Sequence, residues 1–160
     1  MADVVDKATR SRMMSGIKGK NTKPEMQIRK ALHAHGLRYK LHDKSLPGKP
    51  DLVFPRFHAV IFAQGCFWHG HYCEYFKWPK SNPDFWKEKI RDNVARDVKT
   101  ANLLIDQGWR MCSIWECALR KAKPAEIERM ARRIGDWLAR AESRNDNRWK
   151  KLEIPSNPHR

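Results

Sequence analysis

The segment that most constrains this chain is residues 66–73, which read CFWHGHYC and directly follow an apolar run. Thiolate sulfur and imidazole nitrogen suit Zn²⁺, and a structural zinc site closes with four such ligands. Cys117, at the end of a second apolar run, is the natural fourth ligand. We therefore predict that Cys66, His71, Cys73 and Cys117 bind one zinc ion. The alternative is that they are ordinary buried cysteines and a surface histidine.

His69 is left outside this ligand set, beside Phe67 and Trp68. A free imidazole on a loop held by a metal suits a catalytic residue, because histidine changes its charge near neutral pH. The alternative is a solvated histidine, or one that supports a metal ligand. Phe67 and Trp68 lie between predicted ligands on a short loop, which favours exposed rings over core packing.

The chain is strongly basic. It has 160 residues, with 33 Lys and Arg against 18 Asp and Glu, which gives a formal net charge of +15. Such an excess repels itself unless a polyanion is bound, so nucleic acid is the expected partner. No apolar run approaches the roughly 20 residues of a membrane-spanning helix, and no signal-peptide core is visible. We expect no membrane partner and a cytoplasmic protein with reduced cysteines, Cys112 being a plain buried thiol.

Patterning in the first part of the chain predicts two helices and three strands. Residues 6–16 favour a short basic helix or arm. Residues 21–25 (NTKPE) combine a polar cap, a first-turn proline and a carboxylate near the positive end of the helix dipole, which is a helix-start signal. Strands are expected over 37–42, 51–54 and 57–63. The third is apolar almost throughout, which indicates a central strand buried on both faces.

The second part predicts helices and a strand that complete an α/β fold. A long amphipathic helix is expected from Asn82 to Gly108, a strand over 109–115, and a second amphipathic helix over 124–139. Residues 142–160 are polar and contain two prolines, so we expect a flexible or loosely docked tail. This order predicts a mixed sheet flanked by helices on both sides.

Three carboxylates are candidates for catalysis. Asp51 begins a strand beside a turn, at the sheet edge to which the next strand delivers residues 66–73. In a basic nucleic-acid-binding protein, such a carboxylate most simply binds Mg²⁺ that bridges a phosphate oxygen. The alternatives are that Asp51 caps a strand and that Glu25 only complements its helix dipole. Asp97, in the middle of the long helix, is most simply a solvated charge.

These motifs together resemble the very-short-patch repair endonucleases, the mismatch-nicking enzymes of bacteria. The resemblance extends over about residues 1–140. The most specific matching segments are DKATRS at 6–11, SLPG at 45–48 with Pro50-Asp51, GCFWH at 65–69, EKI at 88–90 and WECALR at 115–120.

The resemblance implies a restriction-endonuclease-like fold with a structural zinc site. It implies Mg²⁺-dependent nicking of double-stranded DNA 5′ to the thymine of a T·G mismatch, which initiates very short patch repair. It also implies a monomer active at the bacterial nucleoid, together with a mismatch-sensing protein and a repair polymerase. The chain then divides into a DNA-embracing arm (1–20), an endonuclease domain (21–141) and a tail (142–160).

The resemblance also implies catalytic roles. Asp51 and the backbone carbonyl of Ala63 match the protein ligands of the catalytic Mg²⁺. His69 matches the catalytic histidine, while Glu25 and Asp97 match residues around the active-site water. The predicted zinc ligands are the same four residues as above.

Four further residues match groups that enter the DNA. Phe67, Trp68 and Trp86 match aromatic residues that wedge into the base stack at the mismatch. Met14 lies on the arm that closes over the opposite groove. Unstacking a paired step costs roughly a few kcal/mol. Because a mismatch is weakly stacked, inserting an aromatic wedge there costs less.

The chain departs from the family pattern near the cleavage centre. Gln64 stands where the family commonly has a histidine, and a glutamine donates a hydrogen bond but cannot act as a base. Gly70 and Tyr72 also replace histidines. Two alternatives therefore stay open: the same fold with a broader or different mismatch or sequence specificity, and a zinc-stabilised DNA-binding module without catalysis, for which Asp51 and His69 are spectators.

Overall fold

The computed structural model describes residues 6–15, 20–140 and 150–155, and is built on a five-stranded sheet. The strands lie in the spatial order β1 (Lys40–Leu41), β2 (Leu52–Phe54), β3 (Ala59–Gln64), β4 (Arg110–Trp115) and β5 (Lys151–Ile154). Neighbouring strands from β1 to β3 pair antiparallel, whereas those from β3 to β5 pair parallel. The sheet is therefore mixed, as predicted.

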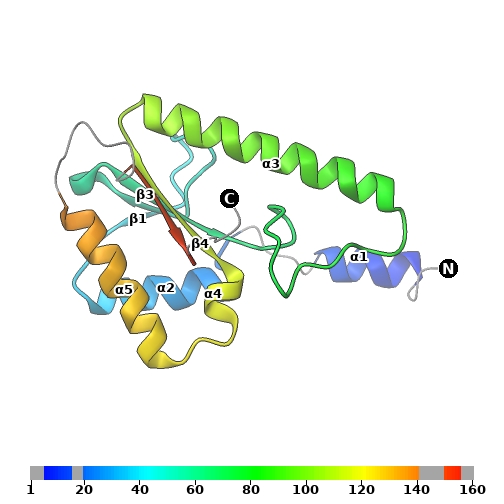
Figure 1. Cartoon of the computed structure of the whole chain (residues 1–160), viewed down its shortest axis with the longest axis horizontal. Helices are drawn as coiled ribbons and strands as arrows, with labels where there is room; N and C mark the ends of the chain where they lie inside the picture. Colours follow the sequence, from blue (N-terminus) through cyan, green and yellow to red (C-terminus); the bar gives the residue numbers. More distant parts are fainter. Residues whose placement is uncertain (1–5, 16–19, 141–149, 156–160) are drawn as a thin grey trace.

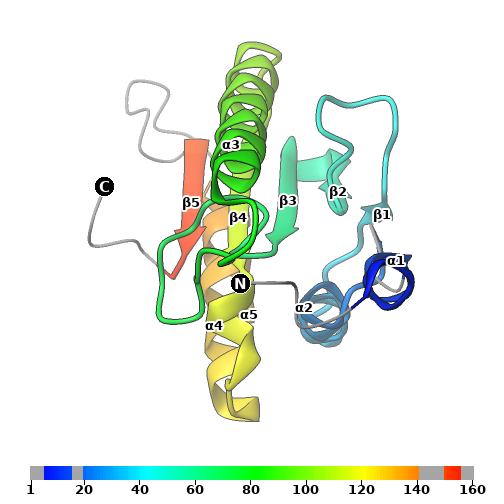
Figure 2. The same cartoon turned by 90° about the vertical axis from the view of Figure 1, so that its right-hand side faces the viewer.

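Helices cover both faces of this sheet. The described helices are α1 (Lys7–Ser15), α2 (Lys23–Ala34), α3 (Pro83–Asp106), α4 (Glu116–Arg120) and α5 (Pro124–Ala139), with a 3-10 turn η1 (Pro55–Phe57). Figure 1 shows α3 running along one face, with α2, α4 and α5 on the other, which confirms the predicted mixed α/β architecture. Figure 2 shows the strands of the sheet side by side.

The alternation of side chains along the strands divides the core into two layers. Ile61 of β3 and Cys112 of β4 belong to the larger layer, which packs against α2 and α5. Val60 and Phe62 belong to the smaller layer, together with Leu104 of α3. β3 is buried on both faces, as its almost continuous apolar sequence predicted. Cys112 is a buried core thiol, also as predicted.

The predicted start of α2 is confirmed. The Thr22 hydroxyl caps the helix by accepting a hydrogen bond from the Glu25 backbone N–H at 3.4 Å. The Glu25 carboxylate in turn accepts from the backbone N–H of Asn21 at 2.6 Å. The first bond satisfies an N–H group that a helix start otherwise leaves without a partner, and the second satisfies the N–H of Asn21, which precedes the cap.

Three expectations are corrected. The strand expected over 37–42 is reduced to Lys40–Leu41, whose exposed side chains show that the alternation there does not mark a buried face. The five-residue α4 was not anticipated, because it is too short to show a helical period. The tail predicted over 142–160 is wrong for 151–154, which form β5: Ile154 is buried in the core, and this burial compensates for ordering a polar segment.

The terminal segments are described only in part. Residues 7–15 form the expected short basic helix, whereas 1–5 and 16–19 of the predicted arm lie outside the described residues. The same holds for residue 141 and for 142–149 and 156–160 of the predicted tail. Within the part of the chain that the structure describes, no helix is both long and apolar enough to cross a membrane.

Candidate functional site

The four predicted zinc ligands meet between the end of β3 and the start of α4. One ligand atom from each of Cys66, His71, Cys73 and Cys117 lies within 4.8 Å of the others, and Cys117 Sγ is 3.7 Å from His71 Nδ1. In a tetrahedral zinc site, ligand distances of about 2.3 Å to sulfur and about 2.05 Å to nitrogen separate S and N by about 3.6 Å. The residues therefore fit a four-coordinate metal ion.

Burial at this cluster explains why a cation suits it. The pKa of the Cys66 thiol and that of the Cys117 thiol are both raised, first of all by burial, which disfavours the charged thiolates. A bound cation reverses this preference, because metal coordination stabilises thiolate directly.

The loop that carries these ligands is pressed against α3. Gly70 has a left-handed φ of 61°, and a Cβ atom there would lie 2.9 Å from Val94 Cγ2. Asn93 Nδ2 donates a hydrogen bond to the Trp68 carbonyl at 2.9 Å. A histidine at position 70 would therefore be strained in this arrangement, which gives a physical reason for the glycine.

His69 and Asp97 form a close pair between this loop and α3. His69 Nδ1 lies 2.6 Å from Asp97 Oδ2, and the two side chains are 30% and 32% exposed. Interpreting Asp97 as a simple solvated charge is therefore wrong. The carboxylate accepts from Nδ1–H in the neutral histidine, which leaves Nε2 as a hydrogen-bond acceptor.

Asp51 lies just before β2, and its Oδ2 accepts a hydrogen bond from the Ala63 backbone N–H at 2.8 Å. Its pKa is raised from 3.8 to about 6, first of all by burial. The bond from Ala63 opposes the rise, the charge of Glu25 adds to it, and the charge of His69 opposes it. Burial makes this carboxyl costly to ionise, and a bound divalent cation would offset that cost. The surroundings of Asp51 therefore suit a metal ligand.

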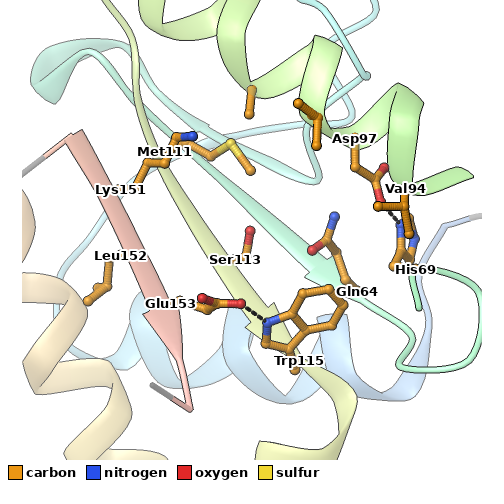
Figure 3. A pocket seen from close by; sticks show the side chains of 12 residues that line it. Gln64, His69, Val94, Asp97, Met111, Ser113, Trp115, Lys151, Leu152 and Glu153 are labelled. Carbon is orange, nitrogen blue, oxygen red and sulfur yellow. Dashed lines mark hydrogen bonds and ion pairs between the residues drawn. The ribbon is translucent and has the colours of Figure 1, made fainter. Parts of the chain in front are cut away.

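A pocket of ≈ 290 Å³ brings the predicted catalytic residues together. Asp51, Ala63, Gln64, His69 and Asp97 all line it. Gln64, at the end of β3, is 7% exposed. Figure 3 shows the adjoining hollow, in which the His69–Asp97 pair and Gln64 lie on one side and side chains of β4 and β5 on the other.

Glu25 lies deeper, with a partner that the sequence analysis missed. The Glu25 side chain is 1% exposed and is bonded to Arg29 at 3.3 Å and to His42 Nε2 at 2.5 Å. One ligand atom from each of Glu25, His42 and Asp51 lies within 4.8 Å of the others. Nothing in the pattern of residues 37–42 singled out His42, whose φ of 48° places it in a turn-like conformation.

The predicted wedge residues gather at and beside the loop of residues 66–73, which carries three of the predicted zinc ligands. The ring of Phe67 lies 5.2 Å from that of Trp68 and 5.3 Å from that of Trp86, measured between centroids. All three are half-buried rather than fully exposed. Three exposed aromatics that the sequence analysis did not select extend this surface, namely Tyr72, Trp78 and Phe85. Met14 lies on α1 and is 45% exposed.

Comparison with known proteins places the chain in a family. The sequence model of a family described as DNA mismatch endonuclease Vsr matches residues 2–75. The DNA mismatch endonuclease Vsr of Escherichia coli (strain K12) is 44% identical over 138 residues, which cover 86% of this chain and 88% of the relative. The chain belongs to the Vsr family of DNA mismatch endonucleases.

Two nicking enzymes are also similar to this Vsr family member. The type II nicking enzyme V.XorIIP of Xanthomonas oryzae pv. oryzae is 44% identical over 119 residues, covering 74% of this chain and 88% of the relative. The type II nicking enzyme V.NmeAIP of Neisseria meningitidis is 44% identical over 138 residues, covering 85% and 99%. The predicted family and the predicted DNA-nicking endonuclease are thereby confirmed.

Proposed function

We propose that this chain nicks one strand of double-stranded DNA 5′ to the thymine of a T·G mismatch, by Mg²⁺-dependent hydrolysis of a phosphodiester bond that initiates very short patch repair. The observation that carries the proposal is the pocket of ≈ 290 Å³ that holds Asp51 together with the His69–Asp97 pair. A metal-binding carboxylate and an oriented imidazole are the two groups that such a hydrolysis requires.

Asp51 and the Ala63 backbone carbonyl would hold the Mg²⁺. When bound, the ion polarises a phosphate oxygen and offsets the charge that develops on it. Asp97 fixes the ring of His69 through Nδ1, so Nε2 is available to take a proton from the attacking water. Gln64 lies in the same pocket and is suited to donate a hydrogen bond to the phosphate, but it cannot accept the proton.

Glu25 acts on this centre through its charge. Asn21, Arg29 and His42 all bond to it, and its charge contributes to the raised pKa of Asp51. We propose that Glu25 orders the water around the cation site. His42, which bonds to Glu25, keeps its carboxylate in place.

The aromatic surface provides the preference for a mismatch. Phe67, Trp68 and Trp86 are positioned to enter a base stack that is already weakened, with Met14 of the arm in the opposite groove. Four zinc ligands stiffen the loop that carries Phe67 and Trp68, so inserting large rings does not collapse it.

The net charge of +15 accounts for the sequence-independent part of DNA binding. We propose a monomer that acts at the bacterial nucleoid in the cytoplasm, with the arm, residues 1–20, embracing the DNA and with a mismatch-sensing protein and a repair polymerase as partners. The fold that we propose for the endonuclease domain, 21–141, is that of the restriction endonucleases.

A nicking assay on a set of end-labelled duplexes tests the proposal. Each duplex carries one mismatch in the same flanking sequence, and a fully paired duplex is the control. We expect Mg²⁺-dependent nicking of one strand, 5′ to the thymine of T·G. Comparable nicking of other mismatches supports the alternative of broader specificity, for which Gln64 is the motivating observation. Nicking of the fully paired duplex at the same rate contradicts both the T·G specificity and the broader mismatch specificity.

A further inference from the structure

Trp115 links the proposed zinc site to the proposed catalytic histidine. It is the last residue of β4 and is 4% exposed. Its ring stacks on that of His71, with centroids 4.3 Å apart and an interplanar angle of 9°. The same ring meets His69 edge-on at 6.4 Å. Any movement of this indole therefore reaches both histidines of the loop.

Glu153 holds the indole in place. Trp115 Nε1–H donates a hydrogen bond to Glu153 Oε1 at 2.8 Å. Glu153 lies on β5, where it is paired with Ser113 of β4 in the parallel register. Its side chain lines a hollow of ≈ 140 Å³ whose other walls include Gln64, His69 and Asp97. Figure 3 shows the bond to Trp115 in this hollow.

We propose that Glu153 is a positioning residue for the nuclease centre and acts through Trp115. This inference rests on the proposed function, because the centre that it supports is the one assigned above. A buried indole N–H without an acceptor is unfavourable, so removing the carboxylate lets the ring leave its place. His71 and His69 then lose the ring against which they pack, so they can shift. The reaction slows as a result, because small displacements of catalytic groups lower the rate strongly.

Glu153 variants separate positioning from folding. Glu153→Ala should lower the single-turnover nicking rate about tenfold, as the loss of outer supports of a metal site does. The affinity for mismatched DNA should change less than about twofold, because no DNA contact is removed. Glu153→Gln retains an oxygen that accepts from the indole, so it should nick at nearly the wild-type rate. Glu128→Ala, which removes an exposed carboxylate from α5, is the matched control.

Two outcomes overturn the proposal. One is a Glu153→Ala protein with the wild-type nicking rate. The other is a Glu153→Gln protein as slow as Glu153→Ala, since the charge rather than the bond to Trp115 is then what matters. If Glu153→Ala does not fold, Trp115→Phe replaces it, because phenylalanine keeps a ring against His71 but has no N–H to donate. It should also be about tenfold slower, and a wild-type rate overturns the proposal.

A measurement without DNA distinguishes this inference from the proposed function. In ¹⁵N-labelled protein, Glu153→Ala should shift the assigned indole N–H resonance of Trp115 and the ring resonances of His69 and His71, whereas Glu128→Ala should not. If these shifts appear but wild-type protein nicks no mismatch, the proposed function fails and the positioning contact stands. If wild-type protein nicks and the shifts are absent, the positioning inference fails alone.

Discussion

Replacing Asp51 by Asn should stabilise the protein while abolishing its activity. The rise in the pKa of Asp51 from 3.8 to about 6 is equivalent to about 3 kcal/mol, since one pKa unit is about 1.4 kcal/mol. Above pH 6 the folded chain bears this cost because the carboxylate is ionised in a buried place. Asn has no charge to bury. Its oxygen still accepts from Ala63 N–H, and the pKa of about 6 already includes the stronger bond that the carboxylate makes there.

The stabilisation from Asp51→Asn is then about 3 kcal/mol at pH 7.5, or about 6–12 °C in Tm for a domain of this size. The size of this stabilisation depends on pH. Between pH 3.8 and about 6 the folded chain binds more protons at Asp51 than the unfolded chain, so wild-type stability falls as the pH rises through this window. At pH 5 about half of the cost, roughly 1.6 kcal/mol, remains, because folding then requires protonation of a carboxyl whose unfolded pKa is 3.8. The two proteins should therefore differ about half as much at pH 5 as at pH 7.5.

Thermal unfolding of both proteins at pH 5 and pH 7.5 measures this difference. The buffers contain neither magnesium nor chelator, so that the zinc ion proposed for the cysteine cluster is not removed. Adding Mg²⁺ at pH 7.5 should raise the Tm of the wild type and leave that of Asp51→Asn unchanged. An Asp51→Asn protein that is less stable than wild type at pH 7.5, or equally stabilised at both pH values, refutes the reasoning from burial.

Three further predictions address other parts of the site. Purified protein should contain one zinc ion per chain by elemental analysis, and Cys117→Ser should lose zinc and thermal stability; full metal content in that variant contradicts the ligand set. Trp68→Ala should weaken binding to T·G duplex more than to paired duplex, by about 1–3 kcal/mol; equal losses at one salt concentration identify the ring as structural support. Asp97→Asn should slow nicking by about 10²-fold or more, with DNA affinity kept, because His69 loses its orientation; a wild-type rate excludes that role.

The grouping of Cys66, His71, Cys73 and Cys117 was predictable from the sequence, because metal-binding side chains are concentrated in one segment. Three of the four lie within residues 66–73, and Cys117 is in a specific motif, so the structure only had to bring two segments together. The central strand was predictable for a similar reason, since burial on both faces requires an almost continuous apolar run. The long helices carry enough turns to show their period.

The contacts that support the site were not predictable. His42 and Glu25 are 17 positions apart, and Trp115 and Glu153 are 38 apart, and neither pair belongs to a shared motif. Such pairs depend on how strands and helices are placed in space. β5 was missed because a short polar segment shows no period, and its order comes from pairing with β4 and from burying Ile154.

The most direct test of the account is single-turnover nicking of one labelled T·G duplex by wild-type and Asp51→Ala protein, with binding to the same duplex measured in parallel. Wild-type protein should nick the thymine strand on its 5′ side only when Mg²⁺ is present. Asp51→Ala should bind the duplex with nearly wild-type affinity and leave it intact, because the wedge does not need the carboxylate. An Asp51→Ala protein that nicks at nearly the wild-type rate would show that the magnesium is held elsewhere, and the assigned centre would be wrong.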